Sequence, residues 1–180
     1  MIEEKKISVT LPVMEHFYTL QGEGYHQGKA AYFIRLGGCD VGCVWCDVKD
    51  SWDASKHPKY SVEYLIIEVK KTPAEIVVIT GGEPLMHNLN NLTSQLKAEG
   101  FQTNIETSGV CAQVTGHWDW ICFSPKKFKK PNEAIYEKAN ELKVIVYNTS
   151  DFEFAEGHAA KVSSDCKLYL QPEWDKATTI

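Results

Sequence analysis

Apolar residues follow two different periods along this chain, and the two patterns alternate. The segments 31–36 and 76–80 are short, almost continuous apolar runs, which favour strands covered on both faces. Between them, Ser61 precedes apolar residues at the i, i+3, i+4 and i+7 spacing over 62–69, which predicts an amphipathic helix with Ser61 as its N-cap. We expect further strands at 14–20, 102–106, 120–123, 142–147 and 168–170, and further helices at 89–96, at 132–139 and after a capping box of Ser150 and Glu153.

Strands that alternate with helices of about ten residues predict an α/β fold with a mostly parallel sheet, here of about six strands. A closed eightfold barrel takes about 250 residues. This chain has 180 residues, so we expect a partial (β/α) barrel or an open sheet. No linker, low-complexity segment or internal repeat divides the sequence, which predicts a single domain over residues 1–180.

The charge balance narrows the classes of partner. The sequence has 19 Lys and Arg residues against 24 Asp and Glu residues, a formal net charge of −5, which argues against binding nucleic acid through its phosphates. No apolar run approaches the roughly 18–20 residues of a membrane helix. The charged start, 1–6, lacks the apolar stretch of a secretory signal. We therefore expect a cytoplasmic protein that binds neither nucleic acid nor membranes, with its six cysteines reduced.

Unusual residues gather where the predicted strands end. They lie at 21–23, in the cysteine-rich segment after residue 36, and at 81–84, 106–108 and 124–126. The carboxyl ends of parallel strands form the rim on which α/β enzymes place their active sites. We therefore expect these five strand ends to meet at one rim.

Three of the six cysteines, Cys39, Cys43 and Cys46, lie within eight residues at a C-x3-C-x2-C spacing. Soft thiolates select zinc, Cu(I) or an iron–sulfur cluster. A structural zinc site usually takes four protein ligands in two short pairs, and the sequence has no second such pair. Three thiolates suit a four-iron cluster whose fourth iron stays open to a ligand. A zinc knuckle with a distant fourth ligand, or three cysteines buried for packing, are the alternatives.

The spacing after a first strand resembles the radical S-adenosylmethionine (SAM) superfamily, whose members hold a [4Fe-4S] cluster on three such cysteines. The fourth iron of that cluster binds SAM. Gly81-Gly82-Glu83-Pro84, at the end of a predicted buried strand, matches the GGEP motif of that superfamily. The resemblance implies that this motif binds the SAM amino group, and a carboxylate with open backbone groups suits an ammonium with three donors.

Within the superfamily the chain is most similar to the 7-carboxy-7-deazaguanine synthases of queuosine biosynthesis, a tRNA modification pathway. The segments that carry the resemblance are Gln21-Gly22-Glu23-Gly24, Arg35 ahead of Gly37-Gly38-Cys39, Trp45-Cys46-Asp47, Thr80-Gly81-Gly82-Glu83-Pro84, Glu106-Thr107, Ser124-Pro125-Lys126 and Leu142-Lys143-Val144. The resemblance implies a lyase that converts 6-carboxy-5,6,7,8-tetrahydropterin to 7-carboxy-7-deazaguanine and ammonia. It also implies an abbreviated barrel, a homodimer and an electron donor such as flavodoxin.

The resemblance also implies site residues. Those for SAM are Trp45, Cys46, Asp47, Gly82, Glu83, Ser124, Pro125 and Lys126, and those for the pterin are Leu20, Gln21, Gly22, Glu23, Arg35 and Thr80. A pterin presents a flat amide-and-amine edge and a carboxylate. Arg35 can meet the carboxylate with a bidentate fork, while Gln21, Glu23 and Thr80 can read the edge.

Two features depart from the family. Members usually carry Thr or Ser after Cys-Asp, and its hydroxyl contributes to a Mg²⁺ site; this chain has Val48, which cannot ligate a hard cation. Asp47 is then the possible side-chain Mg²⁺ ligand, with Ser51 as a neighbour. Members also commonly continue past the 170–172 segment through a helix and a strand, so we expect a short or missing C-terminal cap.

Two rival functions remain open from the sequence. A radical SAM activase that generates a glycyl radical on a partner protein shares the cysteine and GGEP motifs, but it does not need Gln21-Gly22-Glu23-Gly24 or Arg35. An iron–sulfur or zinc module would leave GGEP and Ser124-Pro125-Lys126 unexplained.

Overall fold

The computed structural model describes residues 9–179; the charged start, 1–6, on which part of the cytoplasmic prediction depends, lies outside them. The strands are β1 Thr10–Leu20, β2 Ala30–Leu36, β3 Lys59–Ser61, β4 Ile76–Gly81, β5 Gln102–Thr107, β6 Trp120–Phe123, β7 Glu141–Val146 and β8 Lys167–Pro172. The helices are α1 Val62–Lys70, α2 Asn90–Ala98, α3 Ala134–Lys138 and α4 Ser150–Ala159.

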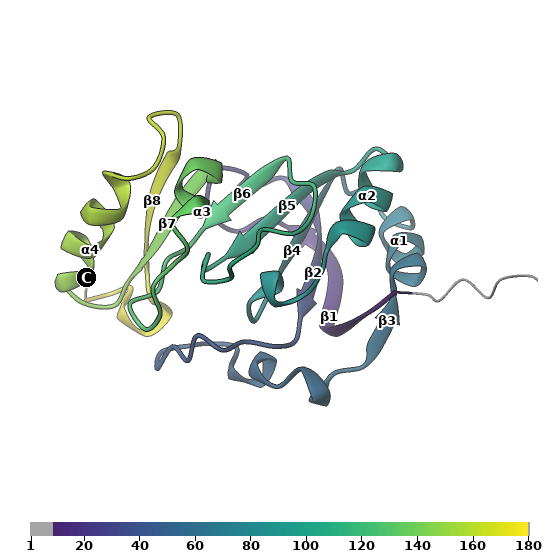
Figure 1. Cartoon of the computed structure of the whole chain (residues 1–180), viewed down its shortest axis with the longest axis horizontal. Coiled ribbons are helices and arrows are strands. Elements are labelled where there is room, and N and C mark those ends of the chain that lie inside the picture. The colour runs from purple at the N-terminus through teal and green to yellow at the C-terminus, as the bar shows by residue number, and fades with distance from the viewer. Residues whose placement is uncertain (1–8, 180) are drawn as a thin grey trace, which may run out of the picture.

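All eight strands form one sheet in the order β3-β1-β2-β4-β5-β6-β7-β8 (Figure 1). Along the part of this order that runs β2-β4-β5-β6-β7-β8, each strand is parallel to the next, whereas β1 is antiparallel to both β2 and β3. The sheet is open, because β3 and β8 are its two edges. The prediction of a mostly parallel, unclosed α/β sheet is confirmed, with β3 as an additional strand of three residues that the sequence pattern missed.

Alternation along the strands gives the sheet an apolar face and a polar face. On β7, Leu142, Val144 and Val146 are buried, and the first two belong to the main core, which they share with residues of α1 and α2. Glu141 and Lys143 point to the opposite face, as the period of two in a strand requires. On that second face, the cluster of buried apolar residues within 9–179 is small and includes Phe33 and Val78.

Helix ends agree with the sequence in two places and differ in a third. Ser61 caps α1 by accepting a hydrogen bond from the Tyr64 amide at 3.1 Å, and Gly100, with φ +88°, follows α2. The capping box at Ser150 is wrong: α4 has no side-chain cap from its N-cap Thr149. Asp151 instead accepts the amides of Tyr147 and Asn148, both at 2.8 Å.

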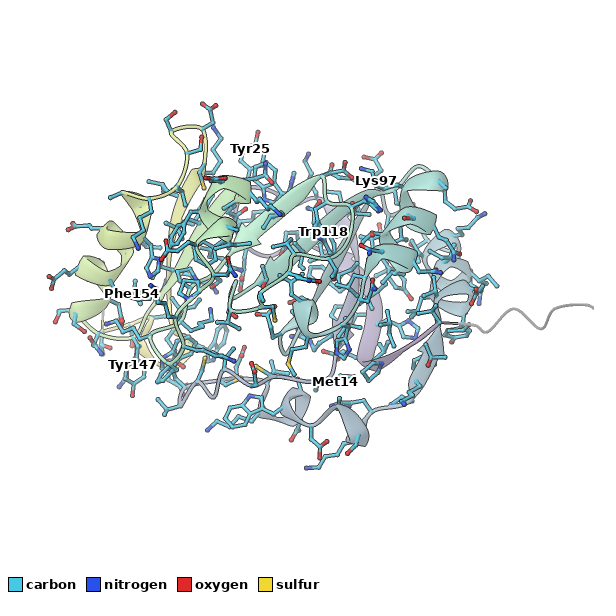
Figure 2. All side chains as sticks on the ribbon, viewed as in Figure 1. Met14, Tyr25, Lys97, Trp118, Tyr147 and Phe154 are labelled. Carbon is cyan, nitrogen blue, oxygen red and sulfur yellow. The ribbon has the colours of Figure 1, made fainter. Side chains whose placement is uncertain are left out.

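The direction of β1 overturns part of the expected rim. Leu20, at the end of β1, pairs with Ala30 at the start of β2, so the segment 21–23 begins at the amino edge of the parallel strands. Figure 2 shows Tyr25 at the upper edge of the molecule, whereas the cysteine segment after β2 runs along the lower edge in Figure 1. Four of the five strand ends therefore share the carboxyl edge, and the loop 21–29 approaches from the opposite edge.

Candidate active site

The cysteine segment is fastened to the carboxyl ends of β2 and β4 by backbone contacts. The Glu83 amide donates to the Gly38 carbonyl at 2.8 Å, and the Gly82 amide donates to the Leu36 carbonyl at 3.0 Å. A Cβ atom on Gly82 would lie 2.2 Å from the Gly38 carbonyl oxygen and 2.9 Å from Cys39 Cβ, so only glycine fits there. The first two glycines of the GGEP motif thus allow two backbones to approach beside the first cysteine.

Cys39, Cys43 and Cys46 carry free thiols, of which Cys43 is buried and the other two are partly exposed. Burial is the main reason that the pKa of the Cys43 thiol is raised to about 11; Lys126 acts in the opposite direction, and the nearby Cys46 and Cys39 act in the same direction as burial. Because the thiolate and not the thiol is the metal ligand, a bound metal would stabilise the ionised form here.

The arrangement of these thiols distinguishes between metal centres. Among the described residues, no three His, Cys, Asp or Glu side chains gather closely enough to hold a single metal ion. Soft thiolate donors are the type that holds an iron–sulfur cluster, and in a four-iron cluster each thiolate binds a different iron. Three neighbouring cysteines of this kind suit a [4Fe-4S] cluster.

Glu83 of the GGEP motif is 1% exposed, and its carboxylate is saturated within the protein. One oxygen accepts from the Leu85 amide at 3.1 Å and the Thr107 hydroxyl at 2.6 Å; the other accepts from the Ser108 amide at 2.8 Å and the Ser108 hydroxyl. With four donors in place, this carboxylate joins the ends of β4 and β5. The groups that the motif can offer a ligand are therefore those of its backbone.

The segment after β6 closes over the cysteine segment. Lys126 donates to the Ser124 hydroxyl at 2.5 Å and lies 5.5 Å from the centroid of the Trp45 ring. Burial lowers the pKa of Lys126. The edge of Phe128 meets Trp45, and Lys129 pairs with Asp40 at 2.6 Å. Three of the residues implied for SAM thus lie together.

A network centred on Glu106 occupies the polar face of the sheet. Strand register aligns Arg35 with Thr80, and Glu106 with Cys122. One Glu106 oxygen accepts from the Gln21 amide at 3.2 Å, and the other accepts from the Thr80 hydroxyl at 3.2 Å. Thr80 and Glu106, near the carboxyl ends of β4 and β5, therefore meet Gln21 of the loop 21–29, although that loop begins at the opposite edge of the sheet.

Lys143 connects Glu23 to this network. Its ammonium lies 2.5 Å from a Glu23 carboxylate oxygen and 3.7 Å from one of Glu106, and its side chain is 6% exposed. Burial alone would lower the pKa of Lys143, but Glu106 and Glu23 outweigh it and raise the pKa above the usual value. Gln171 of β8 donates to the other Glu23 oxygen at 2.7 Å.

Arg35, the only arginine of the chain, lies on the same polar face as Thr80. Its Nε donates to a Glu15 carboxylate oxygen at 2.7 Å, and its side chain is 23% exposed. A guanidinium held through Nε keeps its terminal nitrogens for a second acceptor. Glu15 therefore fixes the direction of the fork.

The other predicted residues lie as follows. Gly22 is exposed in the turn after β1, and Pro125 is buried between Ser124 and Lys126. Leu20 is 61% exposed, and alternation along β1 puts its side chain on the face opposite to Phe17, which stacks on Phe33. Asp47 is exposed, whereas Ser51 is 1% exposed and donates its hydroxyl to the Val48 carbonyl at 2.6 Å.

The sequence alone marks Glu106 and Lys143 only as parts of matching segments and gives no sign of Glu15. A further signal was available for Lys143, because residues 141–144 alternate polar and apolar side chains, whereas in 102–107 only Ile105 is apolar. The pairing of Glu15 with Arg35 depends on the antiparallel register of β1 and β2, which local pattern does not determine.

The comparisons with known proteins agree with this geometry. The model of the radical SAM superfamily matches residues 33–121, and members of that superfamily use a [4Fe-4S] cluster and SAM. A crystal structure of QueE from Escherichia coli is similar with a TM-score of 0.80 at 36% identity, covering 91% of this chain and 83% of that chain.

Sequence relatives are more specific. A 7-carboxy-7-deazaguanine synthase from Flavobacterium psychrophilum is 58% identical over 92% of this chain and 78% of the relative. One from Synechocystis is 49% identical over 94% of this chain and 81% of the relative. These similarities favour neither the activase nor the iron–sulfur or zinc module. With the cysteine segment, the GGEP backbone and the Glu106 network in place, the chain belongs to the 7-carboxy-7-deazaguanine synthase family of the radical SAM superfamily.

Proposed function

We propose that this enzyme converts 6-carboxy-5,6,7,8-tetrahydropterin to 7-carboxy-7-deazaguanine and ammonia. The observation that carries the proposal is the convergence of Gln21, Thr80 and Lys143 on Glu106. An activase needs no such site, because its substrate is a protein backbone. A small, flat molecule with several N–H groups needs acceptors of this kind arranged in one place.

Cys39, Cys43 and Cys46 would hold the cluster, and Trp45, Asp47, Gly82, Glu83, Ser124, Pro125 and Lys126 would form the SAM site beside it. Such a cluster would supply the electron for reductive cleavage of SAM, and SAM would supply the radical chemistry at C6 of the pterin. Glu83 acts indirectly here, because its oxygens already accept four hydrogen bonds.

The chain's own residues orient the pterin. Arg35 would meet the pterin carboxylate with its terminal nitrogens while Glu15 holds Nε. Glu23 and Glu106 offer carboxylate oxygens to the N–H groups of the pterin edge, with Gln21, Gly22 and Thr80 beside them, and Leu20 would contribute through its backbone. Holding C6 at a fixed position is what makes hydrogen abstraction selective.

The resemblance supports further properties of the enzyme. We infer a single domain over residues 1–180, a homodimer, an electron donor such as flavodoxin, and a cytoplasmic place in the tRNA modification pathway. None of the described helices has the length and hydropathy that crossing a membrane requires. For Mg²⁺, Asp47 offers an accessible side-chain oxygen, since Val48 has none and Ser51 is only 1% exposed. This donor set lacks the hydroxyl that members of the family usually carry after Cys-Asp.

Anaerobic reconstitution tests the proposed function directly. The reconstituted enzyme, incubated with SAM, a reductant and 6-carboxy-5,6,7,8-tetrahydropterin, should release 7-carboxy-7-deazaguanine and ammonia, detected by mass spectrometry and an ammonia assay. The Cys46→Ala variant in the same mixture is the control and should form no product. Cleavage of SAM that the pterin neither accelerates nor directs to product would reject the proposal and favour the activase.

A further inference from the structure

We propose that Lys143 is a positioning residue that keeps Glu23 and Glu106 as paired acceptors for the pterin edge and thereby sets the pH range over which the enzyme binds its substrate. This inference rests on the proposed function, and it assigns a role to a side chain that need not touch the substrate.

The geometry places one cation between two carboxylates from different parts of the chain. Glu23 lies in the loop 21–29, Glu106 on β5 and Lys143 on β7. The ammonium is 2.5 Å from Glu23 and 3.7 Å from Glu106, with 6% of the lysine side chain exposed. The lysine is therefore enclosed by the groups it neutralises.

Neutral donors complete the shell on the same carboxylates. Gln171 donates to Glu23, and Gln21 and Thr80 donate to Glu106. Amide and hydroxyl donors orient a carboxylate, but only Lys143 brings a full positive charge within 4 Å of either one among the described residues. Removing that charge would leave two partly buried carboxylates facing each other, and one of them would take up a proton.

The surrounding titratable groups do not replace this charge. Cys122, Glu141 and His26 line the same cavity as Glu23 and Glu106. Burial raises the pKa of Cys122 well above its usual value and lowers the pKa of His26, so both are neutral at pH 7. Burial also lowers the pKa of Lys126, the other lysine near Glu23. Despite its own burial, Glu23 has a pKa below the usual value because Lys143 is beside it.

The consequence for recognition follows from hydrogen-bond chemistry. An ionised carboxylate only accepts hydrogen bonds, so it matches the N–H donors of the pterin edge. A protonated carboxyl carries an O–H donor, which would face those N–H donors without forming a hydrogen bond. In the wild type, the lowered pKa of Glu23 keeps that carboxylate ionised across the working range. In a variant without the cation, the raised carboxyl pKa would make substrate binding weaken as the pH falls.

The test compares Lys143→Met and Lys143→Gln with the wild type in the reconstituted enzyme. At pH 7 we expect KM for the pterin to rise about tenfold or more in both variants, since charge-assisted hydrogen bonds are lost, with a smaller change in kcat. As the pH rises from about 6 to about 8.5, KM should fall in the variants and stay flat in the wild type. Calorimetric titration of the pterin without reductant should give the same trend in Kd.

Two controls separate charge from structure. Lys70→Met removes another ion-paired lysine, 2.5 Å from Glu99 at the surface, and should leave KM unchanged at every pH. Lys143→Gln keeps a donor for Glu23, so it guards against a Met variant that fails to fold. An unchanged KM in Lys143→Gln, or a KM raised equally at all pH values, would overturn the inference. Turnover by the wild type in the same assay checks the proposed function independently.

Discussion

At the scale of single residues, the hydrogen-bond partners of a site residue within the protein determine which of its atoms remain available to a ligand. Arg35 gives Nε to Glu15 and keeps its terminal nitrogens. Glu83 gives all its oxygens to the protein and none to a ligand. Arg35 and Glu83 lie at the ends of neighbouring strands, but Arg35 is available to bind a ligand whereas Glu83 stabilises the fold.

Arg35→Lys keeps the charge and removes the planar fork. We expect KM for the pterin to rise about tenfold or more, because a point charge cannot replace a bidentate contact. SAM cleavage should remain detectable, since the cysteine segment is untouched. Steady-state kinetics over a pterin series, with 5′-deoxyadenosine measured in parallel, checks both statements. An unchanged KM would remove Arg35 from the substrate site.

Val48→Thr introduces the hydroxyl that this chain lacks. The wild type should show only weak stimulation by Mg²⁺, at millimolar concentrations, because Mg²⁺ would depend on Asp47, water and substrate oxygens. The variant should respond at lower Mg²⁺ concentrations. Rates measured over a Mg²⁺ series, with chelator-treated enzyme as the baseline, distinguish the two proteins. Identical response curves would show that position 48 lies outside any Mg²⁺ site.

At the scale of elements, close contacts join the carboxyl ends of neighbouring strands, and these contacts leave little room for a larger side chain. Gly82 packs its backbone against the Gly38 carbonyl, and Glu83 joins β4 to β5. These two residues fix the position of the cysteine segment without providing a ligand to it.

Gly82→Ala should therefore reduce cluster assembly. The added Cβ would have to displace the Gly38 backbone and Cys39, so we expect the iron content after reconstitution to fall by more than half. Gly157→Ala in α4, where no atom lies within 4 Å of the new Cβ, is the matched control. It should keep full iron content and gain about 0.5–1 kcal/mol in free energy of unfolding. Normal iron content in Gly82→Ala would contradict this account.

Asp151→Ala should destabilise the start of α4 by about 1–3 kcal/mol, because two backbone amides and Lys127 lose their acceptor. Burial alone would raise the pKa of Asp151, but Lys127 and the two amides lower it. Its contribution is therefore present above the unfolded carboxyl pKa of about 3.9 and is lost as the pH falls through the lower folded value. Urea unfolding at pH 7 and at acid pH should show a gap between variant and wild type that narrows in acid.

Apolar periodicity and residue propensity predicted the helices and strands well, but they did not predict that β1 runs antiparallel to its neighbours. The apolar run of β4, the cap at Ser61 and the stop at Gly100 follow from propensity and periodicity, and the structure has all three. The antiparallel direction of β1 has no local signature, because it depends on pairing with β2 and β3. The contacts of Arg35 with Glu15 and of Glu23 with Lys143 follow from that direction, so sequence reasoning identified most of the candidate site residues but not their partners.

At the scale of the whole molecule, the six thiols differ in their surroundings. Cys39, Cys43 and Cys46 lie in the cysteine segment, Cys111 is partly exposed in the segment after β5, and Cys122 and Cys166 are buried in or beside the sheet. The lysine-rich run 126–130 is largely neutralised: Lys127, Lys129 and Lys130 pair with acidic residues and Lys126 is committed to the site.

Replacing Cys111, Cys122 and Cys166 together by Ala should leave the cluster intact at about four irons per chain. Cys122 donates only a weak hydrogen bond to Glu141 at 3.5 Å, so a modest loss of stability is the expected cost. Iron and sulfide analysis, together with the absorption spectrum of the reconstituted variant, measures its cluster content. Loss of iron would mean that one of these thiols is a ligand.

The antiparallel β1 also has a consequence for the order in which the enzyme is made. The backbone hydrogen bonds that fasten the cysteine segment to β2 and β4 lie between residues 36 and 83, so they can form early during synthesis, before the pair of Lys129 with Asp40. The pair Glu23–Lys143 joins residues 120 positions apart, and Glu23–Gln171 joins residues 148 apart. Closing such long loops is slow. A chain still emerging from the ribosome can therefore assemble its metal-binding half well before it has any place for a substrate.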